Sequence, residues 1–184
     1  MAKCSPAAQE KLQRSYPDDD LHAEAYSVSM NFESRFRIVP LPAALVTRVR
    51  RTLVDDFGHR LKVTTNASRV PCRFTLEMTE PGEELILLGY SPFTRDHPYR
   101  ETGPIFIRLL GDTGYTDIHH FPPQLDSTKR VFRCYDAEEQ IVDARLGTTD
   151  PESLIVELFA NPHVECIHVR ALTYGCFTFK IERA

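Results

Sequence analysis

Residues 164–183 read VECIHVRALTYGCFTFKIER, and this stretch decides the fold. Apolar and polar side chains alternate within residues 164–171 and again within residues 175–183, which is the period of a β-strand. The short segment from Leu172 to Tyr174 can connect the two strands as a hairpin. The sequence therefore predicts an antiparallel strand pair that has one apolar and one polar face.

The apolar faces of these two strands constrain their pairing. Ile167 and Val169 share a face with the apolar residues of the second strand only if even-numbered residues lie opposite even-numbered ones; those residues are Phe177, Phe179 and Ile181. The polar face then gathers Cys166, His168, Arg170, Cys176, Thr178 and Lys180. Because diagonal neighbours lie about 7 to 8 Å apart, we expect His168 and Cys176 to come close enough to touch.

The preceding residues predict further strands and two helices. Apolar residues at helical spacing predict a helix over 42–57 that ends at Gly58, and Asp150 before Pro151 predicts the start of a second helix over 151–160. The turn residues at 80–83 are expected to fold residues 70–90 into a hairpin whose second arm is a central strand. Strands are expected over 34–39, 61–65, 70–78, 85–90, 105–110, 129–135 and 140–146. The predicted fold is a single compact α+β domain, mainly antiparallel, with two principal helices.

Length and composition indicate one globular domain. The chain has 184 residues, of which 42% are hydrophobic and 26% charged. Residues 1–31 are polar, without a sustained period, and are expected to form a poorly ordered leader before a domain over 32–184. With no signal-peptide core or long apolar run, we expect a cytoplasmic protein without membrane contact.

The charged residues and the cysteines narrow the possible partners. A net charge of −4 provides no positive field for nucleic acid, so we expect no nucleic-acid partner. Five cysteines are an odd number in a chain large enough to fold without disulfides, so free thiols in a reducing compartment are expected. The oligomeric state stays open.

Proline is unusually frequent relative to glycine, with 13 Pro and 8 Gly. Several of these prolines lie in or beside two long connections, residues 91–104 and 111–127. Because long loops with fixed paths are often functional, we expect these connections to be rigid walls of a site.

Cys176 and His168 are the candidate catalytic residues, as a thiol nucleophile and its base. A thiol needs a base or a cation beside it to lower its pKa from about 8.5. The alternative is that Cys176 is a small buried hydrophobe and His168 a hydrogen-bonded strand residue, since no Cys-x-x-Cys or nucleophile-elbow motif is present.

Metal ligation by the cysteines and histidines is disfavoured. Alternate residues of a strand are too far apart to form a compact ligand set, and no zinc-knuckle spacing occurs. We therefore expect no metal site and no cofactor.

The favoured site is a pocket for a small anionic or carbonyl-bearing ligand. Arginine side chains suit carboxylate or phosphate, and tyrosine hydroxyls add directional donors. The candidate ligand-binding residues are Cys72, Arg73, Tyr90, Tyr99, Arg100 and Arg170.

Four segments in order along the chain resemble one known family. They are PCRFTLEMTEPGEELILLGYSPF at 71–93, HPYRETGPIF at 97–106, FRCYDAEEQIVDA at 132–144 and HVRALTYGCFTFKIERA at 168–184. The chain resembles, from about Phe36 to Ala184, the bacterial domain-of-unknown-function family numbered twelve-oh-three. The resemblance implies a single α+β domain and supplies no reaction, ligand or catalytic residue.

Three functions therefore remain open from the sequence. The first is a small-molecule-binding domain or an enzyme of unknown reaction with an Arg/His/Cys pocket. The second is a non-catalytic interaction or structural module, in which the motifs serve only turns and strand ends. The third is a thiol-dependent enzyme that uses Cys176 and His168.

Overall fold

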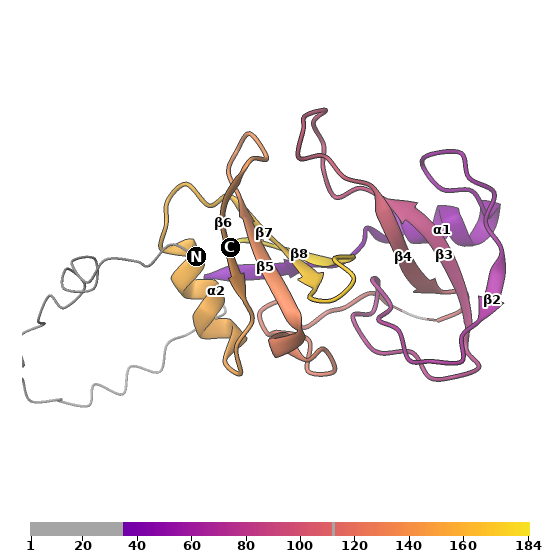
Figure 1. Cartoon of the computed structure of the whole chain (residues 1–184). Coiled ribbons are helices and arrows are strands. Elements are labelled where there is room, and N and C mark those ends of the chain that lie inside the picture. Colours follow the sequence, from indigo (N-terminus) through magenta and orange to yellow (C-terminus); the bar gives the residue numbers. More distant parts are fainter. Residues whose placement is uncertain (1–34, 112) are drawn as a thin grey trace, which may run out of the picture. The chain divides into compact units, whose positions relative to one another are not determined.

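Two antiparallel β-sheets and two α-helices make up the part of the chain that the structure describes (Figure 1). The structure is a computed structural model, and it describes residues 35–111 and 113–184. The expected α+β class is confirmed. The leader expected over residues 1–31 lies outside the described residues. In the described ranges, no helix combines the length and the apolar character needed to cross a membrane.

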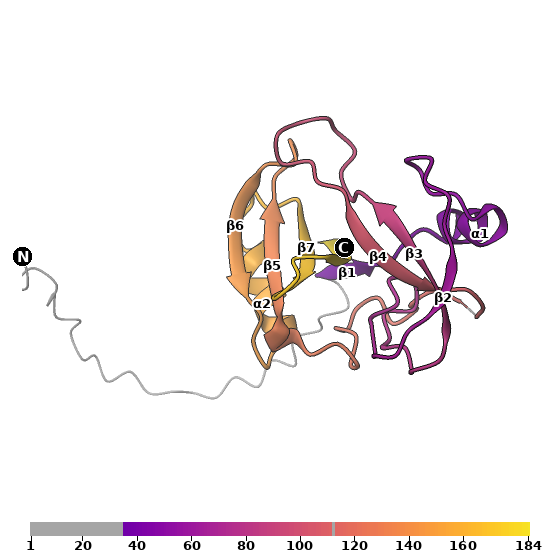
Figure 2. The same ribbon diagram turned by 45° about the vertical axis from the view of Figure 1, so that its right-hand side comes forward.

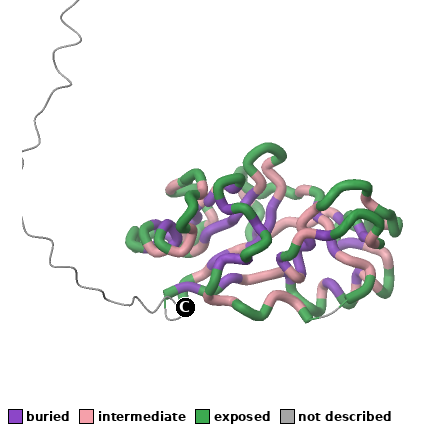
Figure 3. Tube along the Cα trace, turned by 90° about the horizontal axis from the view of Figure 1, so that it is seen from below, coloured by how far each residue is buried: buried purple, intermediate pink, exposed green. Residues whose placement is uncertain are grey.

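The larger sheet has five strands, all antiparallel to their neighbours. Helix α2 (Pro151–Phe159) begins where the sequence predicts, because the Asp150 side chain accepts a hydrogen bond from the N–H of Ser153. It lies beside the sheet (Figure 1), and its Ile155 and Leu158 belong to the first core. Buried and exposed segments of the described chain are distinguished by colour in Figure 3. The strands, in spatial order, are β1 (Phe36–Val39), β8 (Phe177–Arg183), β7 (Cys166–Ala171), β5 (Arg130–Tyr135) and β6 (Ile141–Leu146).

The smaller sheet has three strands, β2 (Val63–Thr65), β3 (Glu84–Tyr90) and β4 (Gly103–Arg108), with β3 in the centre as predicted. Helix α1 (Ala43–Thr52) lies beside this sheet (Figure 2). Its buried valines pack with apolar residues of β3 and β4 to form the second core.

The even-to-even register of the C-terminal strand pair is confirmed, but only as far as Val169. His168 lies opposite Lys180 and Val169 opposite Phe179, and then a β-bulge places Arg170 opposite Phe177. The bulge leaves Thr178 as an extra residue. The prediction that Phe177 and Phe179 share one face is therefore wrong: Phe179 lies in the first core and Phe177 in the second.

The predicted strand over 70–78 and its hairpin with 85–90 are also wrong. Residues 72–77 form a tight loop in which the N–H of Leu76 donates to the carbonyl of Cys72, 2.9 Å away, and Leu76 has a φ of 54°. Phe74 packs in the second core and Leu76 in the first, so the alternation in the sequence reflects two cores and not one sheet face. The turn at 80–83 is confirmed, with Gly82 at a φ of 91°.

The first helix is shorter than predicted. It ends at Thr52 because Leu53 adopts a left-handed conformation with its N–H bonded to the carbonyl of Val49. Gly58, the expected end of the helix, lies instead in the following loop, where the buried Asp55 carboxylate accepts two backbone N–H groups of that loop and the N–H of Gly89 in β3.

Candidate functional site

Arg73 connects the two sheets. Its backbone N–H donates to the carbonyl of Phe106 in β4, and its guanidinium Nε donates to the carbonyl of Phe177 at the start of β8, each over 3.0 Å. Nη1 donates to the carbonyl of Pro71. The residue is only 4% exposed, and its Nη2 has no partner among the described residues.

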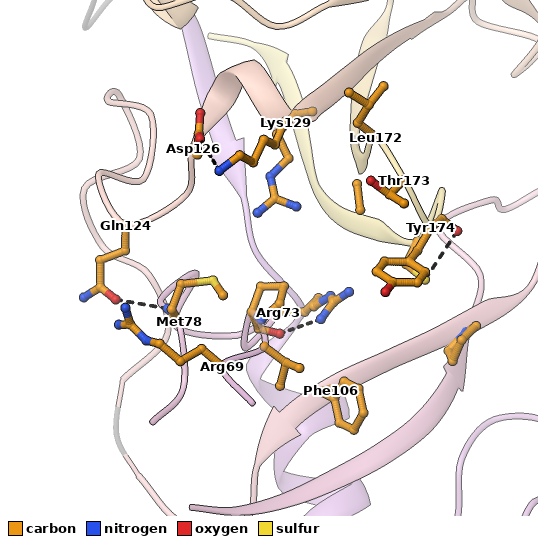
Figure 4. Close-up of a pocket in the computed structure, with 16 residues that line it drawn as sticks. Arg69, Arg73, Met78, Phe106, Gln124, Asp126, Lys129, Leu172, Thr173 and Tyr174 are labelled. Atoms are coloured by element: carbon orange, nitrogen blue, oxygen red, sulfur yellow. Dashed lines mark hydrogen bonds and ion pairs between the residues drawn. The ribbon is translucent and has the colours of Figure 1, made fainter. Parts of the chain in front are cut away.

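A cavity of about 600 Å³, hereafter the main cavity, opens beside Arg73. Its walls come from residues 69–78, β4, the start of β5 and the β7–β8 turn. In Figure 4, Lys129 and Leu172 lie across the cavity from Arg73 and Phe106. Most of the lining is apolar, including Met78, Phe106, Leu172 and Tyr174.

Four cationic side chains line the main cavity, and two of them lack an acidic partner. Arg69 and Lys129 each pair with a nearby carboxylate, at 2.8 and 3.0 Å. Arg130 is 8% exposed, and its side chain forms no hydrogen bond or ion pair with any described residue. Arg73 likewise forms no ion pair within the described ranges, so two buried positive charges remain unneutralised.

The electrostatics of the two buried arginines reflect this lack of partners. Burial lowers the pKa of Arg73 to about 10; the positive charge of Arg130 acts in the same direction, and the thiols of Cys176 and Cys72 oppose it. Burial also lowers the pKa of Arg130, against the opposing effect of Asp126. Both remain cations at neutral pH, and an anion placed between them would relieve the cost of their burial.

A second cavity of about 260 Å³, hereafter the side cavity, adjoins the main one. The two cavities share Pro104, Tyr174 and Cys176 in their walls. The side cavity is lined mainly by polar groups, and it holds Tyr90 and Arg170 of the sequence-predicted set. Of the eight residues expected at one site, four line one or other of these cavities, namely Arg73, Tyr90, Arg170 and Cys176.

Arg170 is the buried cation of the side cavity, at 3% exposure. Its Nη1 donates to the carbonyl of Gly175 over 3.2 Å. Its Nη2 lies 2.7 Å from Oε1 of Glu101 but is not aligned to donate a hydrogen bond, and Nε has no partner in the described residues. Arg133 donates to the same Glu101 oxygen over 3.0 Å. Burial lowers the pKa of Arg170, whereas Tyr135 and Glu101 oppose this shift.

His168 is buried among aromatic rings and lines neither cavity. Its ring centroid lies 4.4 Å from that of Tyr135 and 5.1 Å from that of Phe93. The thiol near its Nε2 is that of Cys166, at 3.9 Å, and not that of Cys176. Burial, followed by the nearby cations Arg170 and Lys180, lowers the pKa of His168 to about 3, so the imidazole is neutral at pH 7.

The two cysteines among the sequence candidates differ in their access to the cavities. Cys176 lines both cavities, whereas Cys72 is fully buried in the second core. All four cysteines of the described residues are free. The catalytic role of Cys176 and His168 stays a prediction, and the structure does not bring the two side chains into contact.

The loop over residues 91–104 contributes Pro92, Glu101 and Thr102 to the side cavity, but its Tyr99 and Arg100 side chains lie outside both cavities. Tyr99 is 46% exposed, and Arg100 pairs with Asp96 at 3.6 Å; neither lines a cavity. Glu139 holds the loop by accepting hydrogen bonds from the backbone N–H and hydroxyl of Thr94. Burial would raise the pKa of Glu139, but the bonds from Thr94, Arg95 and His97 lower it to about 2. The rigidity of this loop stays a prediction, and these bonds are consistent with it.

Sequence reasoning did not find Arg130, Glu101, Arg133 or Tyr174. A signal existed for Arg130, because it is in phase with Phe132 and Cys134, two fully buried residues of β5. A charged residue in phase with buried neighbours marks either a buried cation or the end of the apolar face. No comparable signal existed for Glu101, whose importance depends on contacts across the fold.

Within the described residues, no group of three or more His, Cys, Asp and Glu side chains is placed to hold a metal ion. The comparisons with curated proteins and with solved structures gave no match. A family model described as "Protein of unknown function (DUF1203)" matches residues 69–183. This range covers both cavities, all eight candidate residues and most of the two sheets. The chain therefore belongs to the DUF1203 family of proteins of unknown function.

Proposed function

We propose that this protein binds a small organic anion in the main cavity, with the anionic group between Arg73 and Arg130. The observation that carries the proposal is the pair of buried guanidinium groups that line a cavity without an acidic partner in the described residues. Unpaired buried charges are costly, so a fold that keeps them gains little stability from them.

The donors still available at the two arginines suit a carboxylate or a phosphate. Two nitrogens of the Arg73 guanidinium donate hydrogen bonds to backbone carbonyls, and these bonds fix the plane of the group. Its Nη2 and the whole guanidinium of Arg130 remain for a ligand. Guanidinium groups bind such planar or tetrahedral anions through parallel N–H donors, and these charge-assisted bonds are roughly twice as strong as neutral ones.

The rest of the cavity suits an apolar body. Met78, Phe106, Leu172 and Tyr174 supply apolar surface, and the volume of about 600 Å³ is typical of small-molecule sites. Tyr174 is 85% exposed, so its ring can fold over a bound ligand at the rim. These features favour an organic acid or an organic phosphate over a bare inorganic ion.

The test uses probes that differ in charge but share a body. Benzoate, 3-phenylpropionate and phenyl phosphate are titrated into the full chain at constant ionic strength, with benzamide and 3-phenylpropionamide as uncharged controls. We expect the anions to raise the thermal unfolding temperature and to bind in calorimetry, and the amides to do neither. Equal behaviour of acids and amides would refute the proposal.

Two variants separate the cavity from a general charge effect. Arg130→Met removes the unpaired guanidinium and should weaken binding about tenfold or more, because the charge-assisted bonds are lost. Arg51→Met makes the same charge change at an exposed position of α1 and should leave binding unchanged. The same loss of affinity in both variants would indicate a diffuse field and not a site.

The thiol of Cys176 provides an independent readout, because this residue lines the cavity wall. A bound anion should slow alkylation of Cys176 in proportion to its occupancy. Alkylation of the fully buried Cys134 serves as an internal control for unfolding.

A further inference from the structure

We infer that the ligand carries a second anionic group, which enters the side cavity and takes the place of the Glu101 carboxylate at Arg133 and Arg170. This inference deepens the proposed function and rests on it. It specifies the ligand as a dianion whose two charged groups lie on either side of an apolar or short linking segment.

The two cavities are adjacent. Pro104, Tyr174 and Cys176 contribute to the walls of both, so a ligand seated in one lies against the residues that bound the other. The β7–β8 turn that carries Tyr174 and Cys176 begins immediately after Arg170 and Ala171. The inferred ligand must therefore be long enough to reach from Arg73 to Arg170 around this turn.

The side cavity has hydrogen-bond donors without a partner. Arg170 is 3% exposed, yet its Nε has no partner among the described residues and its Nη2 is poorly aligned toward Glu101. The hydroxyl of Tyr135 lies behind the cavity wall, where it interacts electrostatically with Arg133 and Arg170 but has no well-aligned hydrogen bond with a described residue. Buried donors without acceptors are uncommon in folded proteins, and an acceptor from a ligand would satisfy them.

Glu101 is a poor counter-ion for Arg133 and Arg170. A single oxygen, Oε1, contacts both arginines, at 3.0 and 2.7 Å, so neither pair has the two parallel bonds of a bidentate contact. The Glu101 side chain is also 44% exposed, so its pair with the partly exposed Arg133 contributes little to stability, whereas the buried Arg170 needs an acceptor from either Glu101 or a ligand. A ligand carboxylate or phosphate with better geometry can displace it at small cost.

The two cavities together carry an excess of positive charge. Arg73 and Arg130 are unpaired in the main cavity, and Arg133 and Arg170 share one acid in the side cavity. Three positive charges therefore remain in excess, in a chain whose net charge is −4. This local excess is more than a monoanion would neutralise.

The test compares chain-length series of monocarboxylates (butyrate to octanoate) and α,ω-dicarboxylates (succinate to suberate) by calorimetry with the full chain at constant ionic strength. One dicarboxylate length should bind at least tenfold more tightly than the monocarboxylate of the same carbon number. If monocarboxylates bind and no dicarboxylate binds more tightly, the second group is refuted while the proposed function stands. If neither series binds, the proposed function fails as well.

Variants of the side cavity sharpen the result. Glu101→Gln removes the competing carboxylate and should tighten dicarboxylate binding several-fold with little effect on monocarboxylates. Glu138→Gln, an exposed residue on the β5–β6 turn, makes the same charge change away from the site and should change neither. Arg133→Gln, which is one-third exposed and therefore a mild change, should abolish the advantage of the dicarboxylate. An unchanged ratio of affinities in both Glu101→Gln and Arg133→Gln would overturn the inference.

Discussion

Arg108 and Arg73 are both largely buried arginines at the smaller sheet, but their surroundings are opposite. Arg108 donates to the carboxylates of Glu83 and Glu77, each at 2.7 Å, and to the hydroxyl of Thr75 at 2.8 Å. Arg73 bonds only to backbone carbonyls among the described residues and lines a cavity. The acids raise the pKa of Arg108 despite its burial, whereas burial lowers that of Arg73 to about 10.

This difference separates a structural cation from a binding cation. The charge of Arg108 is matched by two carboxylates inside the fold, and four of its five N–H donors are used there, although it too lines cavities. Arg73 and Arg130 form no ion pair with a described residue, and Asp126 acts on Arg130 only without direct contact. Burial alone is therefore a poor guide to function, and the presence or absence of an acidic partner is the informative observation.

The pKa of His168 in the folded protein is about 3, so the unfolded chain takes up a proton near pH 6.5 and the folded protein does not. Stability is complete above pH 6.5 and is lost as the pH falls toward 3. His168→Phe should remove this loss and be more stable than the wild type at pH 4.5, relative to pH 7, by about 3 kcal/mol.

Urea unfolding at pH 7 and pH 4.5 measures this difference, with the exposed His163→Phe as the control. An equal acid sensitivity of wild type and His168→Phe would show that His168 becomes charged within the fold. Its charge would then, like those of the unpaired arginines, be available for function.

Arg108→Met should give the next largest effect. It leaves two carboxylates without their cation, and we expect a loss of about 2 kcal/mol in the free energy of unfolding, because the acids are partly exposed. Adding Glu77→Gln and Glu83→Gln to this variant should restore part of the loss. Denaturant unfolding checks both results, and a neutral Arg108→Met would remove the structural role assigned to this residue.

Arg130→Met should have the smallest effect on stability. Since its guanidinium has no partner in the described residues, replacement by an apolar chain should leave the unfolding free energy within about 1 kcal/mol of the wild type, or raise it. The same urea experiment measures it. A loss as large as that of Arg108→Met would show that Arg130 has a structural partner, and would erase the distinction between the two classes of arginine.

The elements that the sequence predicts well are those whose period reflects a single environment. The strands β5 and β7 and helix α2 each have one face toward the first core, so their period translates directly into structure. Residues 70–78 alternate equally well, but Phe74 and Leu76 pack in different cores. Local sequence contains no information that distinguishes one core from two, so the predicted strand there is wrong.

Part of the candidate site could also be predicted from the sequence. Arg73, Arg170 and Cys176 line cavities, and each occupies a segment that matches the family. Tyr99 and Arg100 do not, because the carboxylate of Glu139, some forty residues away, fixes the path of their loop. Long-range hydrogen bonds of this kind leave no periodic trace in the chain.

The bulge at Thr178 has a consequence for how the protein unfolds. Because Phe177 and Phe179 lie in separate cores, loss of either core removes part of the packing of the same strand. Neither sheet can open without loosening the other, so the amide hydrogens of β8 should exchange with solvent only through global unfolding. One additional residue in one strand thus makes two hydrophobic cores a single cooperative unit.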